Sequence, residues 1–210
     1  MRELTYTLLS DGSSDQVLLP VITWLIRQAD VPFVLQPEWA DLRRLPIKAK
    51  NLREKIQQAI DLYPCDLLFV HRDAEREERQ HRIDEINNAL EGIDHPPVVC
   101  VVPVRMQEAW FLFDETAIRS AAGNPNGENA LELPPISSLE QLPDPKRILH
   151  NLILEASSLP THRRRKFNVP VSVHRIPLYI NDFSPLRVLE SFSVLENDIR
   201  YVINENILNR

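Results

Sequence analysis

The sequence predicts an α/β protein whose mostly parallel sheet has four strands, or slightly more, with helices on both faces and a helical C-terminal part. Apolar runs at residues 4–9, 33–35, 67–70 and 98–104 alternate with segments whose apolar residues recur at helical spacing. Near-continuous apolar runs are typical of parallel strands that are buried on both faces. Their alternation with helices over the first hundred residues predicts βα units in a single sheet.

The elements of the first half follow from local residue patterns. The polar turn 10–15 ends the first strand, and Ser14 or Asp15 can cap the helix that follows. Amphipathic spacing then predicts helices over 48–63 and 76–90, each leading into the next apolar strand.

The second half is predicted to be helical. Asp144 followed by a proline is typical of a helix start. We expect an α/β core over residues 1–122, a surface loop rich in Asn, Gly, Pro and Glu over 123–143, and a helical extension over 144–210. The extension is expected to pack on the core as one compact unit.

Composition narrows the class of protein. Hydrophobic residues make up 43% of the 210 residues and charged residues 26%, as in ordinary globular proteins. No apolar run of membrane-spanning length and no signal-peptide pattern occurs, so we expect a cytoplasmic protein with no membrane contact. With a net charge of −6, contact with nucleic acid needs a local basic patch or a metal ion. The four glycines form neither a GxGxxG nor a GxxxxGK phosphate loop.

Acidic residues follow three of the predicted strands. Asp11 and Asp15 come after the first strand, Asp73 and Glu75 after the third, and Glu108 after the fourth. Parallel strands end at one edge of the sheet, so we expect these carboxylates to converge there. In an extended segment Asp73 and Glu75 point to the same side and can share Mg²⁺ or Mn²⁺. The same acids are also explained as helix caps and first-turn residues.

His71 lies in the same stretch as the acids after the third strand. It is a ligand, a proton carrier or a packed strand residue. Lys146 stands in the first turn of its expected helix, where the helix dipole disfavours a cation, so an acidic partner or a ligand is expected beside it.

Basic side chains offer candidate phosphate contacts. Arg105 either binds phosphate or pairs with Glu108. The one dense basic run is either a solvated segment or a phosphate-binding segment. Its candidate contacts are Arg163, Arg164, Arg165 and Lys166.

These features resemble the TOPRIM domain of topoisomerases, bacterial primases and overcoming-lysogenization-defect nucleases. The segments EAWFLFD (108–114), DPK (144–146) and SPLR (184–187) further resemble a family of uncharacterised bacterial TOPRIM-like proteins, over about residues 4–195. The resemblance implies a TOPRIM/Rossmann-like fold. It also implies an ATPase partner in phage defence, because relatives of this family often stand beside ATPases.

TOPRIM domains use a glutamate after the first strand as proton carrier and an Asp-x-Asp pair to hold Mg²⁺. Here the first acid is Asp11, which is shorter than glutamate. The pair reads either His71-Arg72-Asp73 or Asp73-Ala74-Glu75, so one aspartate is replaced in either frame.

Two functions follow as expectations. The first is a Mg²⁺- or Mn²⁺-dependent nuclease or phosphoryl-transfer protein that acts on nucleic acid, with Asp73, Glu75 and Asp11 at the metal and Asp11 and Glu108 as catalytic groups. The second is a catalytically silent adaptor or sensor that uses the fold and the loop 123–143 to bind a protein partner, such as an ATPase.

Overall fold

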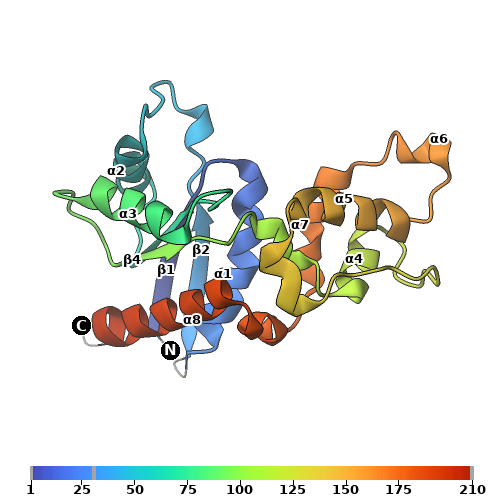
Figure 1. The fold of residues 1–210 in the computed structure, drawn as a ribbon. Coiled ribbons are helices and arrows are strands. Elements are labelled where there is room, and N and C mark those ends of the chain that lie inside the picture. Colours follow the sequence, from blue (N-terminus) through green and yellow to red (C-terminus); the bar gives the residue numbers. More distant parts are fainter. Residues whose placement is uncertain (1, 30–31, 209–210) are drawn as a thin grey trace. The chain divides into compact units, whose positions relative to one another are not determined.

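The computed structural model describes residues 2–29 and 32–208, which form two compact units (Figure 1). Within these residues, the first unit contains the chain up to Pro103 together with the segment from Val194 onward, and the second unit contains Val104–Ser193. The division therefore falls before the expected boundary at residue 122, and the end of the expected extension belongs to the first unit.

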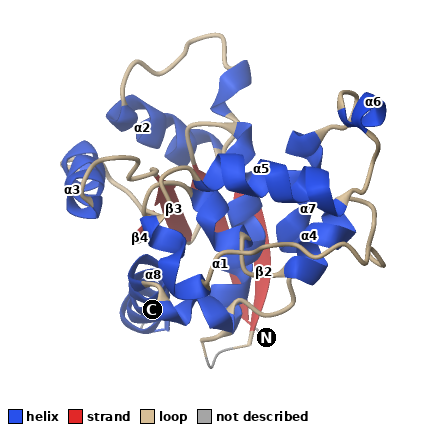
Figure 2. Ribbon diagram, turned by 45° about the vertical axis from the view of Figure 1, so that its right-hand side comes forward, coloured by secondary structure: helices blue, strands red, loops and turns tan. Residues whose placement is uncertain are grey.

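The first unit is built on a four-stranded sheet in which every strand is parallel to its neighbours. The strands lie in the order β2-β1-β3-β4. Their bounds are β1 Arg2–Leu9, β2 Phe33–Trp39, β3 Leu67–His71 and β4 Val98–Val101. The predicted α/β class with a mostly parallel sheet is confirmed, and the strands are drawn in red in Figure 2.

Strand β2 is longer than its apolar run predicts. It continues through Pro37 to Trp39, and its exposed residues alternate with partly buried ones at the start of the strand. An edge strand accepts a proline because one side of its backbone has no partner strand. Strand β4 is shorter than predicted and ends at Val101.

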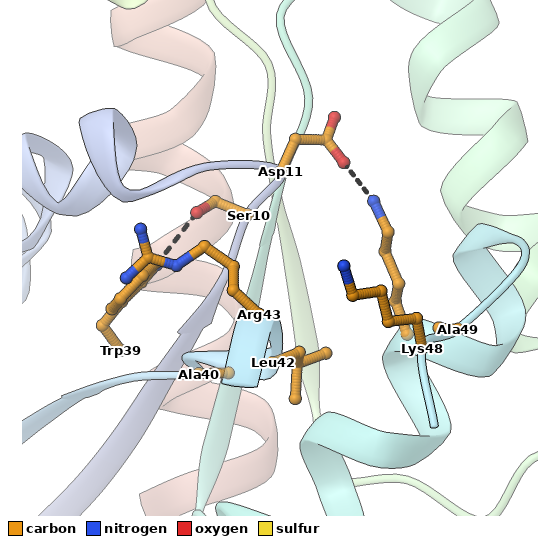
Figure 3. A pocket seen from close by; sticks show the side chains of 9 residues that line it. Ser10, Asp11, Trp39, Ala40, Leu42, Arg43, Lys48 and Ala49 are labelled. Carbon is orange, nitrogen blue, oxygen red and sulfur yellow. Dashed lines mark hydrogen bonds and ion pairs between the residues drawn. The ribbon is translucent and has the colours of Figure 1, made fainter. Parts of the chain in front are cut away.

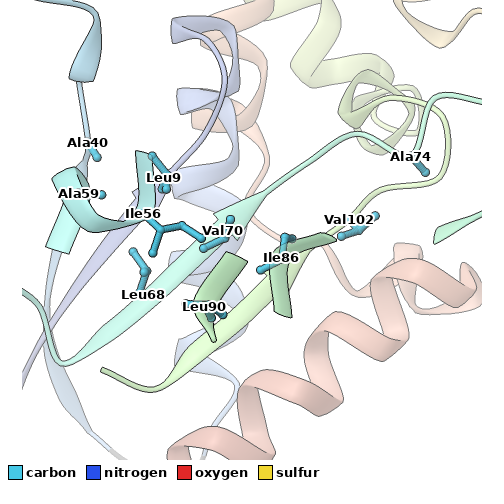
Figure 4. Packing of buried hydrophobic residues seen from close by; sticks show 10 residues of the cluster. All are labelled: Leu9, Ala40, Ile56, Ala59, Leu68, Val70, Ala74, Ile86, Leu90 and Val102. Atoms are coloured by element: carbon cyan, nitrogen blue, oxygen red, sulfur yellow. The ribbon is translucent and has the colours of Figure 1, made fainter. Parts of the chain in front are cut away.

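Helices cover both faces of this sheet. On one face lies α1 (Leu18–Arg27), which follows the short 3₁₀ helix η1 (Ser13–Val17), and the Tyr6 hydroxyl of β1 donates to the carbonyl of Leu19 at 3.2 Å. On the other face lie α2 (Leu52–Leu62) and α3 (Arg79–Leu90). Their core cluster with the strands consists of Leu9, Ala40, Ile56, Ala59, Leu68, Val70, Ala74, Ile86, Leu90 and Val102 (Figure 4).

Both helices on this second face begin later than helical spacing alone predicts. Asn51 caps α2, since its side chain accepts the N–H of Glu54 at 2.9 Å. Helix α3 begins at Arg79, which leaves residues 72–78 as a loop after β3. That loop is free to form part of a site.

The second unit is helical. Its elements are η3 (Gln107–Phe111), α4 (Glu115–Ala121), η4 (Ile136–Gln141), α5 (Pro145–Ala156), α6 (Thr161–Arg164), α7 (Val169–Tyr179) and η5 (Ser184–Val188). Helix α4 packs on α5 and α7, and η3 packs on α5, which is why the segment from 104 to 122 belongs here. Trp110 stacks edge-on against Phe192 with ring centroids 5.4 Å apart. The segment 123–143 is mostly exposed, but Leu139 of η4 is buried.

Helix α8 (Glu190–Val202) starts in the second unit and continues into the first, where a π-helical segment, η6 (Ile203–Leu208), follows it. Glu140 accepts the N–H of Ser191 at 3.0 Å and so satisfies a free donor at the start of α8. Among the described helices, none combines the length and the apolar character needed to cross a membrane.

Candidate functional site

The carboxyl ends of β1 and β3 meet where the order of the sheet reverses. From β1 the chain goes to β2 on one side, and from β2 it crosses to β3 on the other side of β1. Open α/β sheets bind ligands in the crevice at such a reversal. A cavity of about 310 Å³, here called the switch-point cavity, lies there. It is lined by Asp11, Gly12, Ser14, Asp15, His71, Arg72, Asp73, Glu75 and Arg82.

Asp11 follows β1, and two cations share its carboxylate. Oδ1 lies 2.6 Å from Nζ of Lys55 on α2, and Oδ2 lies 2.8 Å from Nη1 of Arg72. Burial raises the pKa of Asp11, but the Lys55 hydrogen bond and the charges of Arg72 and Lys55 outweigh it, so the pKa lies below its ordinary value. Asp11 therefore stays ionised, and it is a weak base at neutral pH.

Arg72 and Arg82 bring two guanidinium groups to the switch-point cavity. Glu85 of α3 binds both, at 3.2 Å from Arg72 and 3.0 Å from Arg82. Arg82 also donates from Nε to the backbone carbonyl of Asp73 at 3.2 Å. These contacts hold both guanidinium groups in place, and guanidinium groups suit phosphate oxygens.

His71 is the last residue of β3, and its side chain is buried beside Asp73. Nδ1 lies 2.9 Å from the carbonyl oxygen of Val101. A carbonyl oxygen only accepts, so Nδ1 carries the proton, and Nε2 faces Oδ1 of Asp73 at 3.6 Å. His71 is thus a packed strand residue. Its orientation is also the one common in metal-bound histidines, which donate their other N–H to a backbone carbonyl or a carboxylate.

Glu75 reaches the cavity through a tight turn. The N–H of Glu77 donates to the carbonyl of Ala74 at 2.9 Å, and Glu75 has a left-handed backbone with φ of 54°. This differs from the extended backbone on which the expected common direction of Asp73 and Glu75 rested. Both still line the cavity. Neither caps the next helix, because α3 begins at Arg79.

Asp15 organises the turn after β1. Its carboxylate accepts the N–H of Gly12 at 3.0 Å and the hydroxyl of Ser14 at 2.8 Å, and the residue is 7% exposed. For this acid the local capping explanation describes the observed contacts.

Glu108 lies in the second unit, in η3, and is 5% exposed. Nζ of Lys146 on α5 is 3.6 Å from its carboxylate, which gives Lys146 the acidic partner expected from its place in the first turn. The role of Glu108 as a catalytic group stays a prediction.

The other candidate phosphate contacts also belong to the second unit. Arg105 has a left-handed backbone, with φ of 64°. The basic run lies on and just after α6, and Arg163, Arg165 and Lys166 are exposed and make no ion pair with any described residue. Arg164 donates to the carbonyl of Leu159 at 2.8 Å. These contacts agree with a solvated segment, and phosphate contact stays a prediction.

The donor chemistry of the switch-point cavity fits a divalent cation only in company with a ligand. Over residues 2–29 and 32–208, no group of three or more His, Cys, Asp or Glu side chains is arranged to hold a metal ion. Asp73 and Glu75 nevertheless supply oxygen donors, and Mg²⁺ is commonly bound by one or two carboxylates together with substrate phosphates and water. The cavity therefore fits a metal that binds together with a phosphate.

Comparison of the chain with protein-family models, with curated proteins and with solved structures found no significant match. The class of protein is accordingly defined by the fold and the site alone: an α/β protein with a polar cavity at the switch point of its parallel sheet.

Sequence reasoning did not single out Lys55, Arg82 or Glu85, which complete the charged network around Asp11 and Asp73. All three lie on helices, and an exposed charge on an amphipathic helix gives no sign of the partner it will meet. Arg72 offered the one usable signal, because it directly follows a buried strand.

Proposed function

We propose that the chain is a Mg²⁺- or Mn²⁺-dependent, TOPRIM-like nuclease or phosphoryl-transfer protein that acts on nucleic acid. The observation that carries this proposal is the switch-point cavity, where Asp73 and Glu75 stand with Arg72 and Arg82. Carboxylates attract a cation and guanidinium groups attract phosphate, so the cavity suits a phosphodiester and its metal together.

The residues of the chain divide this work. Asp73 and Glu75 would hold the metal, with Nε2 of His71 beside Asp73. The metal, when bound, supplies charge stabilisation at the phosphodiester oxygens and polarises a water molecule. Arg72 and Arg82, both anchored by Glu85, orient the phosphate.

The contacts of Asp11 favour a positioning role over proton transfer. Its carboxylate orients Lys55 and Arg72, and its lowered pKa makes it a poor proton acceptor at neutral pH. Glu108 is a candidate catalytic group on the basis of its place after the fourth strand in the sequence alone.

The test is cleavage of supercoiled plasmid, linear DNA and RNA by the purified chain with Mg²⁺ or Mn²⁺. Asp73→Ala is compared with Asp94→Ala, which removes an exposed carboxylate outside the cavity. We expect cleavage that EDTA stops, that Asp73→Ala abolishes and that Asp94→Ala retains. Equal cleavage by the two variants, or cleavage that survives EDTA, would contradict the proposal.

A second candidate function is that of a catalytically silent adaptor or sensor in phage defence. Such a protein would use the TOPRIM-like fold to bind a protein partner, such as an ATPase. It is favoured by the neutralisation of Asp11 by Lys55 and Arg72. Absence of cleavage on every substrate, with and without the ATPase, together with retained binding of that ATPase, would support this candidate over the nuclease.

A further inference from the structure

A second cavity adjoins the switch-point cavity, and Asp11 lines both. This β1–β2 cavity has a volume of about 190 Å³ and lies beyond the carboxyl ends of β1 and β2 (Figure 3). Its lining residues are Ser10, Asp11, Trp39, Ala40, Leu42, Arg43, Lys48, Ala49 and Lys55.

Three cations line the β1–β2 cavity against the single carboxylate of Asp11. They come from separate segments: Arg43 from the 3₁₀ helix η2 (Leu42–Arg44), Lys48 from the loop before α2, and Lys55 from α2. In a protein with a net charge of −6, this is a local basic site of the kind that nucleic-acid contact requires.

Arg43 is fixed before any ligand arrives. Its Nε and Nη2 donate to the carboxylate of Asp41 at 2.7 and 2.9 Å, and its guanidinium lies 4.8 Å from the ring centroid of Trp39. Trp39 is in turn held by its Nε1, which donates to the hydroxyl of Ser10 at 3.0 Å. A guanidinium held in this way loses little further freedom when it binds an anion.

The ammonium group of Lys48 is wholly available to a ligand. It is exposed, and within the described part of the chain its ammonium makes no hydrogen bond or ion pair. Lys55, by contrast, is paired with Asp11 at 2.6 Å. An anion that enters the cavity would therefore form an ion pair with Lys48 without breaking any existing contact.

The size and lining of the cavity indicate a single phosphate group. Sites for whole small molecules usually measure about 300–1,000 Å³, so a volume of about 190 Å³ is too small for a nucleotide. Trp39 is 8% exposed and covered by Arg43, so its ring face is not open to a base.

We propose that the β1–β2 cavity binds one phosphate group of a nucleic-acid strand, next to the phosphodiester in the switch-point cavity. The proposal rests on the proposed function for its choice of nucleic acid. Lys48 and Arg43 make the contact, and Asp11, as the common wall, holds Lys55 toward one cavity and Arg72 toward the other. The phosphate is either an internal one of the strand or a terminal one.

The test is binding of a fluorescent single-stranded oligonucleotide to the full chain in EDTA, measured by anisotropy over a range of salt concentrations. Lys48→Gln is compared with Lys50→Gln, an equal charge change at an exposed lysine outside the cavity. The logarithm of the binding constant falls linearly with the logarithm of the salt concentration, and this dependence is the salt slope. For single strands, loss of one phosphate contact lowers the magnitude of the salt slope by about 0.7, which corresponds to an affinity about fivefold to tenfold weaker at low salt. We expect this for Lys48→Gln, and no change for Lys50→Gln.

Oligonucleotides with a 5′-phosphate or a 5′-hydroxyl separate the two sources of phosphate. If Lys48→Gln weakens the binding of both oligonucleotides, the cavity binds an internal phosphate. If it weakens only the binding of the 5′-phosphorylated oligonucleotide, the cavity binds a terminal phosphate. Equal affinities and equal salt slopes for Lys48→Gln and Lys50→Gln overturn the phosphate site, even if the chain cleaves nucleic acid. Because binding is measured in EDTA, a Lys48-dependent contact without metal-dependent cleavage upholds the phosphate site and removes only the nuclease.

Discussion

The carboxylate of Asp11 forms an ion pair with Arg72 at 2.8 Å, so the segments that directly follow β1 and β3 are joined. A first prediction follows from this pair. Asp11→Asn removes a negative charge between Lys55 and Arg72 while keeping the shape of the side chain. We expect oligonucleotide binding in EDTA to tighten by about twofold to fivefold, the size of one partly exposed charge interaction.

Asp66→Asn serves as the control for Asp11→Asn, because it makes the same chemical change away from both cavities. If Asp11→Asn instead weakens binding, the loss of the orientation that Asp11 gives its two cations outweighs the removal of its negative charge, and the electrostatic expectation is wrong.

The second prediction concerns the left-handed turn at Glu75. A non-glycine residue in this conformation destabilises the folded state by about 1–2 kcal/mol. Glycine adopts the conformation without this strain, and only its greater conformational freedom in the unfolded state favours unfolding. We expect Glu75→Gly to leave the free energy of unfolding unchanged or to raise it by up to about 1 kcal/mol, while metal-dependent cleavage falls. Urea unfolding measures the first effect and plasmid cleavage the second.

Glu77→Gly is the matched comparison, because Glu77 lies in the same turn without a positive φ. It should lower the free energy of unfolding by about 0.5–1 kcal/mol. If the two variants are equally destabilised, the backbone of Glu75 is not strained.

The third prediction uses the pair of Glu108 and Lys146 in the second unit. Burial and the charge of Lys146 lower the pKa of His150, and the charge of Glu108 opposes them. Lys146→Met should therefore raise the pKa of His150, and Glu108→Gln should lower it further. Histidine NMR titration measures both shifts, and shifts of the same sign would contradict the arrangement.

The fourth prediction concerns stability in alkali. Burial, with a smaller contribution from Asp198, raises the pKa of the Cys100 thiol to about 11, against an ordinary value of 9.0. The folded state thus holds this proton more tightly than the unfolded state does. Its contribution to stability is complete below about pH 9 and is lost as the pH rises toward 11. Cys100→Ala should flatten the decline in the free energy of unfolding over this interval.

Cys65→Ala is the comparison for Cys100→Ala, because burial also raises the pKa of Cys65, but less far. It should flatten the decline less than Cys100→Ala does. An identical pH profile for Cys100→Ala and the unchanged protein would show that the thiol is accessible to water.

The fifth prediction tests the buried cluster between α2, α3 and the sheet. Ile56 is fully buried between α2 and the sheet, and Ile56→Ala should lower the free energy of unfolding by about 2–4 kcal/mol. Ile47 is 77% exposed, so Ile47→Ala should change it by no more than about 0.5 kcal/mol. Denaturant unfolding of both variants gives the comparison, and similar losses would place Ile56 outside the core.

The class of fold could be predicted because buried parallel strands leave continuous apolar runs, as Leu67–His71 and Val98–Val101 do. Strand β2 was predicted too short, since an edge strand needs apolar residues on fewer sides. The boundary between the units could not be predicted. The helical segment after β4 finds its partners in α5 and α7, and such tertiary packing leaves no local signal.

The site residues that lie next to strand ends could be predicted from the sequence. The site residues that lie on helices could not. Asp73 could be predicted because it closely follows an apolar strand. Lys55 looks like any solvated lysine on α2 until the fold brings it within 2.6 Å of Asp11. The direction of Glu75 was likewise out of reach, because its left-handed turn depends on the hydrogen bond from Glu77 to Ala74.

Pro37 has a consequence for how this protein behaves in a crowded solution. The outer side of β2 is an open edge, and open edges can recruit strands from other molecules and start aggregation. Pro37 has no N–H to offer an incoming strand, and Glu38 beside it is exposed and charged. These two residues therefore protect the β2 edge against pairing with a strand of another molecule.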